Sequence, residues 1–321
     1  MINIILSILF KSTGLPKGVA KMKSLLSILD IKNEIDEILE LAKQFKESKV
    51  KDKPLEGKSL AMIFQKSSTR TRVSFEVGMY ELGGNSLFLS ANELQMGRGE
   101  PIADTAKVLS RYVDGIMIRA VNHQDVVEFA EEADVPLISG LTDLEHPCQV
   151  LADMQTVKEY KGNFDGKFTY VGDGNNVCNS LLLICACLGM DISIATPKGY
   201  EPNKEIIAEG EKIAKSTGSN ILITDDVKLA VKDSDIVYTD VWVSMGDEGQ
   251  EEKRRNDLIK YQVNKELMEL AHPDAIFMHC LPAIRGEEVS AEVIDGPQSV
   301  ILEQAENRLH AQKAVLYYLL H

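Results

Sequence analysis

Short apolar runs of strand length alternate with amphipathic helical segments from residue 59 onward. This alternation is typical of βαβ units, in which crossover helices join parallel strands. The first series of apolar runs predicts strands near 59–64, 86–90, 115–118 and 136–140. The helices of this series are expected near 70–82, 102–112, 123–133 and 147–161.

A second series of the same kind follows the polar turn at residues 161–166. Its strands are expected near 167–172, 191–196, 220–224, 235–241 and 275–279, and its helices near 176–188, 203–216, 227–232 and 264–271. A short apolar strand at 300–302 and a final helix at about 304–320 complete the pattern. We therefore expect an α/β protein with two doubly wound domains and mostly parallel sheets. Because such sheets bind ligands at the carboxyl ends of their strands, the active site should lie in the cleft between the domains.

The domain boundaries follow from the length and from the polar turn. A chain of 321 residues is long for a single core. We place the first domain at 22–160 and the second at 161–303, with the final helix, 304–321, packing back on the first. Residues 1–21 are expected to lie outside the fold, as an upstream extension. Their apolar run, 1–10, has no basic residues before it and is too short to span a membrane.

The charge excludes two classes of partner. A formal charge of −14 argues against general binding of nucleic acids or of anionic membranes, since both require a basic face. The one dense basic cluster, residues 253–255, is flanked by acidic residues and is interpreted as a solvated surface. Five cysteines without a disulfide-like framework are typical of a reducing, cytoplasmic environment. Any anion site must therefore be local.

The segment 68–72, with the sequence Ser-Thr-Arg-Thr-Arg, follows the first apolar run and precedes a helical pattern in which Val73, Val77 and Tyr80 recur. Unpaired N–H groups and the positive end of the helix dipole meet at such a turn, which favours an oxyanion. A bare capped helix would also place Ser and Thr here. Two arginines at the end where the dipole disfavours cations instead indicate a phosphate site.

Three further side chains stand at strand or helix ends. Arg119 ends a predicted strand, where α/β proteins expose functional groups, although it could equally be an isolated capping arginine. His146 lies just outside a helix that begins at Pro147, and Gln149 lies in its first turn. Taken singly, His146 is also compatible with a capping or core role.

The segment 172–177, Gly-Asp-Gly-Asn-Asn-Val, resembles a dinucleotide fingerprint only in part. The third glycine is absent and no acidic residue closes the next strand, so NAD binding is disfavoured. Asp240 follows another strand and could pair with a substrate ammonium or form a turn. Cys280 follows a strand before Pro282, which could form a cis peptide bond, and Arg308 on the last helix could simply be surface charge.

Together these segments resemble the aspartate/ornithine carbamoyltransferase family, from about Met22 to the end of the chain. The matching motifs are Ser-Thr-Arg-Thr-Arg at 68–72, His-Pro-Cys-Gln at 146–149, Asp-Gly-Asn-Asn at 173–176, Asp-Val-Trp-Val-Ser-Met-Gly at 240–246 and His-Cys-Leu-Pro at 279–282. The last two look like the ornithine branch, as opposed to the aspartate branch or putrescine-specific relatives. Many relatives carry a histidine where this chain has Ile284, so no proton-transfer role is expected there.

The resemblance implies transfer of the carbamoyl group from carbamoyl phosphate to the δ-amine of L-ornithine, giving L-citrulline and phosphate. It also implies a homotrimer that needs neither a metal nor an organic cofactor. The alternatives are a carbamoyltransferase for another amine such as putrescine, a non-catalytic anion-binding homologue, and an NAD-dependent enzyme. In the resemblance, the first domain binds carbamoyl phosphate and the second binds ornithine.

The resemblance also assigns roles to the residues of the carbamoyl phosphate half-site. Arg119 bridges the phosphate and the carbonyl oxygen, and His146 with Thr71 polarises that carbonyl. Gln149 and the backbone carbonyl of Leu281 hold the carbamoyl amide. The further members of this half-site are Ser68, Thr69, Arg70, Cys280, Arg308 and Gln95, the last reaching the site of a neighbouring subunit.

The ornithine half-site is implied in the same way. Its members are Asn176, Asp240, Ser244 and Met245, with Cys280 and Asp240 orienting the side-chain amine. The resemblance thus gives catalytic roles to Arg119, His146, Asp240 and Cys280. The attacking amine must be neutral, and at neutral pH this costs about 4–5 kcal/mol for an amine with a pKa of about 10.4. We therefore expect a rate that rises with pH.

Overall fold

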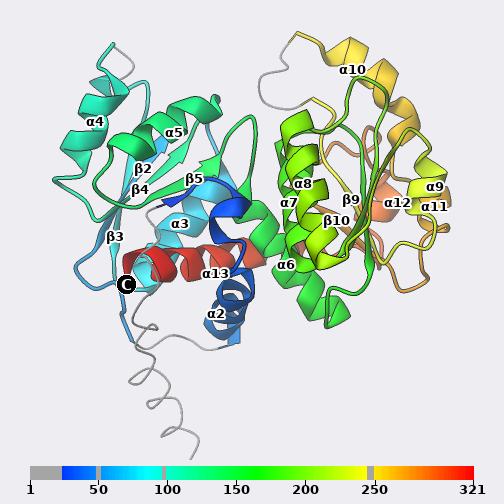
Figure 1. The fold of residues 1–321 in the computed structure, drawn as a ribbon, viewed down its shortest axis with the longest axis horizontal. Coiled ribbons are helices and arrows are strands. Elements are labelled where there is room, and N and C mark those ends of the chain that lie inside the picture. The colour runs from blue at the N-terminus through cyan, green and yellow to red at the C-terminus, as the bar shows by residue number, and fades with distance from the viewer. Residues whose placement is uncertain (1–23, 48–51, 96–98, 244–248) are drawn as a thin grey trace, which may run out of the picture.

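Two parallel sheets lie side by side in the computed structural model, which describes residues 24–47, 52–95, 99–243 and 249–321 (Figure 1). The expected extension at 1–21 and the predicted site residues Ser244 and Met245 lie outside the described residues. Helices α6 and α7 pack together between the two halves. Among the described residues, no helix is both long and apolar enough to cross a membrane.

The first sheet has the order β1-β5-β4-β2-β3, and each neighbouring pair is parallel. Its strands are β1 (Ser24–Leu25), β2 (Ser59–Phe64), β3 (Asn85–Ser90), β4 (Gly115–Arg119) and β5 (Leu137–Leu141). Its helices are η1 (Ile28–Ile31), α2 (Ile35–Glu47), α3 (Thr69–Glu81), α4 (Ile102–Leu109), α5 (His123–Glu132) and α6 (Pro147–Lys161). The central strands β2 and β4 are buried almost throughout, because helices cover both faces of a sheet of this kind.

The second sheet has the order β10-β9-β6-β7-β8 and is also parallel. Its strands are β6 (Lys167–Val171), β7 (Asp191–Ala195), β8 (Ile221–Thr224), β9 (Ile236–Thr239) and β10 (Ile276–His279). Its helices are α7 (Asn176–Leu188), α8 (Lys204–Thr217), α9 (Val227–Val231), α10 (Glu251–Leu258), η3 (Ile259–Tyr261), α11 (Lys265–Met268) and α12 (Ala291–Ile294). The predicted α/β class with two doubly wound, parallel sheets is confirmed.

The last helix, α13 (Ile301–Leu320), packs against α2, α3 and α6 of the first half (Figure 1). Lys313 on α13 forms an ion pair with Glu81 on α3, with 2.6 Å between Nζ and Oε2. Asn307 donates to Thr156 of α6 over 2.9 Å. The chain thus returns from the second sheet to complete the first half.

The predicted strand at 300–302 is wrong, because α13 already begins at Ile301. The strand-like pairing with β10 is a single bridge, between Phe277 and Ser299. A short apolar run does not distinguish a strand from the first turn of a buried helix. Here the run belongs to the first turn of α13, which packs against α6.

Two of the three apolar residues that predicted α3 lie on its outer face. Val73 is 51% exposed and Tyr80 is 80% exposed, whereas Phe75, Gly78 and Met79 are buried. The helical period was therefore correct, but the face that packs on the sheet is a different one.

Candidate active site

One cavity of about 200 Å³ lies where the carboxyl ends of strands from the two sheets meet. Residues of the first half that line it are Ser68, Arg70, Thr71, Arg119, Leu141, His146 and Gln149, joined by Arg308 from α13. Residues of the second half that line it are Asn176, Val177, Asp240, Val241, Val243, Cys280, Leu281 and Pro282. Eleven of the sequence-predicted site residues therefore share one cavity, namely Ser68, Arg70, Thr71, Arg119, His146, Gln149, Asn176, Asp240, Cys280, Leu281 and Arg308.

Three guanidinium groups converge on the first wall. Arg70 lies in the first turn of α3, whose N-cap Ser68 accepts a hydrogen bond from the N–H of Thr71 over 3.3 Å. Arg119 ends β4, and the buried Arg308 comes from α13. Burial, and then the nearby charges of Arg308 and Arg70, lower the pKa of Arg119 to about 10. Like charges held together in a half-buried site favour an anionic ligand.

Two of these arginines keep a buried donor without a protein partner. Within the described residues, the Nε atoms of Arg119 and Arg308 are buried and make no hydrogen bond. Asp240 is the one carboxylate among the described residues that line the cavity, and it lies on the opposite wall. No carboxylate of the first half is therefore among the described residues that line the cavity beside these guanidinium groups.

His146 stands at the N-cap position of α6, where Pro147 begins the helix as predicted. Its backbone N–H donates to Ser180 of α7 over 2.9 Å, which fixes the helix start against the second half. Burial and the charges of Arg308, Arg119 and Arg70 hold the pKa of His146 well below its usual value. The imidazole is therefore neutral at physiological pH and can donate a hydrogen bond without carrying charge.

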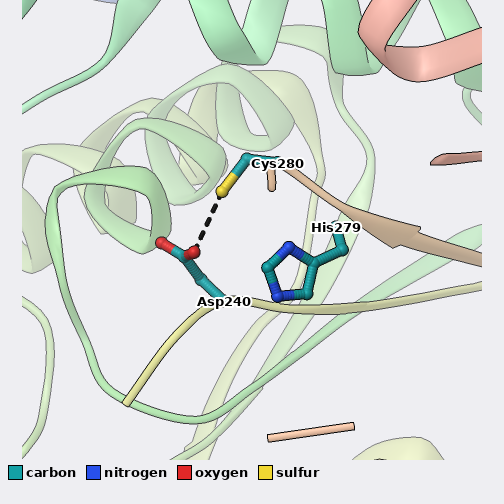
Figure 2. Close-up of side chains that lie close together, drawn as sticks. All are labelled: Asp240, His279 and Cys280. Atoms are coloured by element: carbon teal, nitrogen blue, oxygen red, sulfur yellow. Dashed lines mark hydrogen bonds between the residues drawn. The ribbon is translucent and has the colours of Figure 1, made fainter. Parts of the chain in front are cut away.

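Asp240 and Cys280 face each other on the second wall (Figure 2). The Cys280 thiol donates to Oδ1 of Asp240 over 3.0 Å, and Asn175 donates to Oδ2 over 2.7 Å. Burial, and then the charge of Asp240, raise the pKa of Cys280 well above its usual value. The thiol thus remains protonated and orients the carboxylate. Asn175, which belongs to the Asp-Gly-Asn-Asn motif at 173–176, also caps α7.

His279 lies beside this pair, and one ligand atom from each of the three residues lies within 4.8 Å of the others (Figure 2). Both ring nitrogens of His279 are already engaged. Nδ1 accepts from the N–H of Leu281 over 2.8 Å, and Nε2 lies 3.2 Å from the buried carboxylate of Glu288. A metal could use His279 only by breaking one of these contacts.

The turn after β10 brings the two walls into direct contact. Arg70 donates to the backbone carbonyl of Leu281 over 2.6 Å, so a residue of the phosphate turn reaches the second half. The Leu281–Pro282 peptide bond is cis, a possibility that the sequence analysis raised for Pro282. Leu281 is therefore held between the two half-sites.

The side chains of two sequence-predicted residues do not line the cavity. Thr69 is exposed at the start of α3, and Gln95 is exposed in the loop after β3. Neither side chain belongs to the cavity lining.

The interpretation of residues 253–255 as a solvated cluster is wrong for Arg254. Its guanidinium is largely buried and forms an ion pair with Asp173 over 2.7 Å. It also lies over the ring of Tyr200, 5.3 Å from the ring centroid. The sequence could not reveal this, because the partners lie about 50 and 80 positions away in the chain.

Both halves match the domains of one protein family. Residues 23–159 match the carbamoyl-P binding domain of aspartate/ornithine carbamoyltransferase, and residues 165–319 match its Asp/Orn binding domain. Among curated proteins, the chain is 67% identical to the ornithine carbamoyltransferase of Methanobrevibacter smithii over 300 residues. That match covers 93% of this chain and 100% of the relative.

Solved structures give the same result. The ornithine carbamoyltransferase of Pyrococcus furiosus is similar with a TM-score of 0.90 and 54% identity, covering 93% of this chain and 97% of that one. The anabolic ornithine carbamoyltransferase of Campylobacter jejuni follows with a TM-score of 0.89 and 44% identity, covering 93% and 99%. Both domain models match, and the relatives align over nearly their full length. This chain therefore belongs to the aspartate/ornithine carbamoyltransferase family.

Proposed function

We propose that this chain transfers the carbamoyl group of carbamoyl phosphate to the δ-amine of L-ornithine, giving L-citrulline and phosphate. The observation that carries the proposal is the opposition of two walls in one cavity. One wall presents three guanidinium groups and a neutral histidine, and the other presents a carboxylate held by a thiol. The names of the relatives at 55–67% identity support the ornithine reaction over other carbamoyl transfers.

The phosphate dianion binds at the start of α3 in this proposal. Ser68, Thr69, Arg70 and Thr71 hold it together with the N–H groups of the first helical turn, where the dipole favours negative charge. Arg119 bridges from the phosphate to the carbonyl oxygen. Because the dianion offsets the repulsion between Arg70, Arg119 and Arg308, its binding relieves the unfavourable charge arrangement of the free site.

The carbonyl oxygen is polarised by donors that are already in place. Thr71, Arg119 and the neutral His146 surround its position and stabilise the oxyanion of the tetrahedral intermediate. Each well-placed donor of this kind contributes about 3 kcal/mol to the transition state. Because His146 is neutral in the free site, it can donate a hydrogen bond to the carbonyl oxygen without carrying charge.

Ornithine binds against the second wall. Asn176 and Asp240, with Ser244 and Met245 by resemblance, hold its amino-acid end, while Cys280 and Asp240 orient the side-chain amine. The amine attacks the carbamoyl carbon in its neutral form, the carbon–oxygen bond to phosphate breaks, and the departing phosphate accepts the proton. The carbonyl of Leu281 and the side chain of Gln149 hold the carbamoyl amide during transfer.

We also propose a cytoplasmic homotrimer. The exposed apolar side chains Val73 and Tyr80 of α3 lie in the same half as Leu87 and Phe88 of the edge strand β3, which are 44% and 38% exposed. Helix α3 contacts β3, and exposed apolar side chains gathered near one edge of a sheet are typical of a subunit contact. Gln95 follows this strand and would reach the phosphate of a neighbouring subunit. Sedimentation velocity of the full chain tests the assembly.

The boundaries of the two functional units are part of the same proposal. Residues 22–160 with the helix at 304–321 form the carbamoyl phosphate unit, and residues 161–303 form the ornithine unit. The packing of α13 on α2, α3 and α6 supports the return of the last helix to the first unit.

A substrate panel tests the reaction. Purified protein is incubated with carbamoyl phosphate and, separately, ornithine, putrescine, aspartate or N-acetylornithine, and the ureido product is measured. We expect product with ornithine and at least a hundredfold lower rates with the others, because only ornithine presents both a free α-amino acid and a δ-amine. Comparable rates with putrescine, or no product with any amine, would overturn the proposal.

A further inference from the structure

A fully buried carboxylate stands behind the carbamoyl subsite and takes no part in the proposed reaction. Asp153 lies on α6 one turn after Gln149, is 0% exposed, and is not one of the described residues that line the cavity. Its Oδ1 atom accepts from Nε2 of Gln149 over 2.8 Å and from Nε2 of Gln304 over 2.7 Å. Residues four apart lie on one helix face, so the first contact is built into α6.

This contact fixes which end of the Gln149 amide faces the cavity. A glutamine amide is a donor at nitrogen and an acceptor at oxygen, and the two ends have nearly the same shape. Asp153 offers Gln149 an acceptor, whereas Arg308 offers only donors and gives one to Oε1 of Gln149 over 2.6 Å. Turning the amide over would place a donor against the guanidinium and an acceptor against the carboxylate. Both neighbours therefore enforce the orientation in which Oε1 lies beside Arg308, which lines the cavity, and Nε2 lies beside Asp153, which does not.

The orientation does not depend on the charge of Asp153. Burial raises the pKa of Asp153 to about 7, against hydrogen bonds from Gln149 and Gln304 that lower it. Oδ1 is engaged with two N–H donors, while Oδ2 makes no hydrogen bond to the described residues. A proton would therefore reside on Oδ2, and Oδ1 would still accept from Gln149.

We propose that Asp153 is a positioning residue that makes the Gln149 subsite an acceptor, and thereby selects the NH₂ group of a carbamoyl phosphate over the methyl group of an acyl phosphate. The inference rests on the proposed function. Carbamoyl and acetyl phosphate share the phosphate and the carbonyl, and they differ at the one group that Gln149 meets. A polar group left without its partner in a buried site costs about tenfold in affinity or more.

The test is equilibrium binding of each ligand to the full chain without ornithine. Isothermal titration calorimetry at low temperature gives the dissociation constants of carbamoyl phosphate and of acetyl phosphate, and their ratio measures selectivity. A general loss of structure weakens both ligands and leaves this ratio unchanged. If the wild-type chain does not bind carbamoyl phosphate, the proposed function fails. If it binds carbamoyl phosphate and forms citrulline, an unexpected result with the Asp153 variants contradicts this inference alone.

Two substitutions distinguish the effect of the hydrogen-bond acceptor of Asp153 from the effect of its charge. Asp153→Asn keeps one oxygen for both amides, so we expect a selectivity ratio within about threefold of wild type. Asp153→Leu removes the acceptor, so we expect selectivity to fall about tenfold, through weaker binding of carbamoyl phosphate. Unchanged selectivity in the leucine variant, or an equal loss in the asparagine variant, would overturn the inference.

Gln304→Leu is the matched control. It removes the other amide partner of Asp153 from α13 and leaves the contact between Asp153 and Gln149 in place. We expect its selectivity to match wild type even though Gln304 also accepts from the N–H of His279 over 2.9 Å. A loss as large as that of Asp153→Leu would show that the whole network, and not the Gln149 orientation, sets selectivity.

If Asp153→Leu does not fold, variants that exchange the hydrogen-bond donor and acceptor between positions 149 and 153 test the inference instead. Gln149→Glu places two carboxyl groups against each other and should weaken carbamoyl phosphate binding. Adding Asp153→Asn restores the hydrogen bond with its direction reversed, because the new amide at position 153 donates to the carboxylate at position 149. The second oxygen of that carboxylate still serves as the acceptor of the subsite. We expect the double variant to recover at least tenfold of the lost affinity, and the absence of recovery would refute the inference.

Discussion

The buried carboxyl group of Asp153 should make the stability of the protein fall as pH rises through the neutral range. The ordinary pKa of an aspartate is 3.8, and burial raises that of Asp153 to about 7. The folded chain therefore holds this proton up to about pH 7, whereas the unfolded chain releases it near pH 4. Stability from this group is fully present below about pH 4 and is lost as pH rises to 7.

The magnitude follows from the difference between the two pKa values. Each pKa unit corresponds to about 1.4 kcal/mol, so the whole change is about 4 kcal/mol in free energy of unfolding. Most practical measurements cover pH 5 to pH 8, where the predicted loss is about 2–3 kcal/mol. Asp153→Asn cannot titrate, so the variant should gain this amount relative to wild type over the same interval.

Urea denaturation of both proteins at pH 5, 6, 7 and 8 and at one protein concentration measures the difference. Glu145, whose pKa burial also raises to about 7, is present in both proteins and cancels from the comparison. The free-energy difference between variant and wild type should change with pH and level off above pH 8. A difference that stays constant from pH 5 to pH 8 would show that Asp153 is ionised in the folded chain and refute the reasoning.

Three further outcomes are expected from the site. Arg70→Ala should lower kcat/KM for carbamoyl phosphate at least about a hundredfold with an unchanged near-UV circular dichroism spectrum, because Arg70 is the proposed partner of the phosphate and also donates to Leu281. A loss below tenfold would contradict its place in the phosphate site. Asp240→Asn should raise KM for ornithine about tenfold or more and leave KM for carbamoyl phosphate within about threefold. The reason is that the new amide would direct a donor at the Cys280 thiol or at Asn175. Equal effects on both substrates would argue against separate half-sites. The rate with ornithine should rise about tenfold per pH unit from pH 6 to 9 while chemistry limits turnover, because the δ-amine must lose its proton, and a flat profile would exclude this requirement.

Much of the fold was predictable because strand and helix periods are local properties of the sequence. Most strands and helices of the two sheets lie within a few residues of their predicted bounds, although β1, α10 and α12 were not predicted. Arg119 and Asp240 both follow or end strands at the carboxyl edge of their sheets, and both line one cavity. The face of α3 was not predictable, since Tyr80 is apolar yet exposed. Whether an apolar residue is buried depends on what packs beside it, and the helical period does not report that.

The polar network around Asp153 could not be predicted from the sequence either. Gln149 and Asp153 lie on one helix, but Gln304 and Arg308 come from about 150 positions later in the chain. Nothing in a single sequence connects such positions. The same limit applies to Arg254, whose acidic sequence neighbours suggested a surface residue although its partner is Asp173.

The return of α13 to the first half has a consequence for synthesis on the ribosome. Until residues 301–320 have left the exit tunnel, α2, α3 and α6 lack the helix that covers them, and the apolar side chains beneath it remain exposed to solvent or chaperones. The nascent chain also lacks Arg308, one of the residues that line the cavity, so the proposed carbamoyl phosphate site is not yet complete. Any stabilisation of this half by the proposed ligand would therefore follow translation, even though most of its residues are translated first.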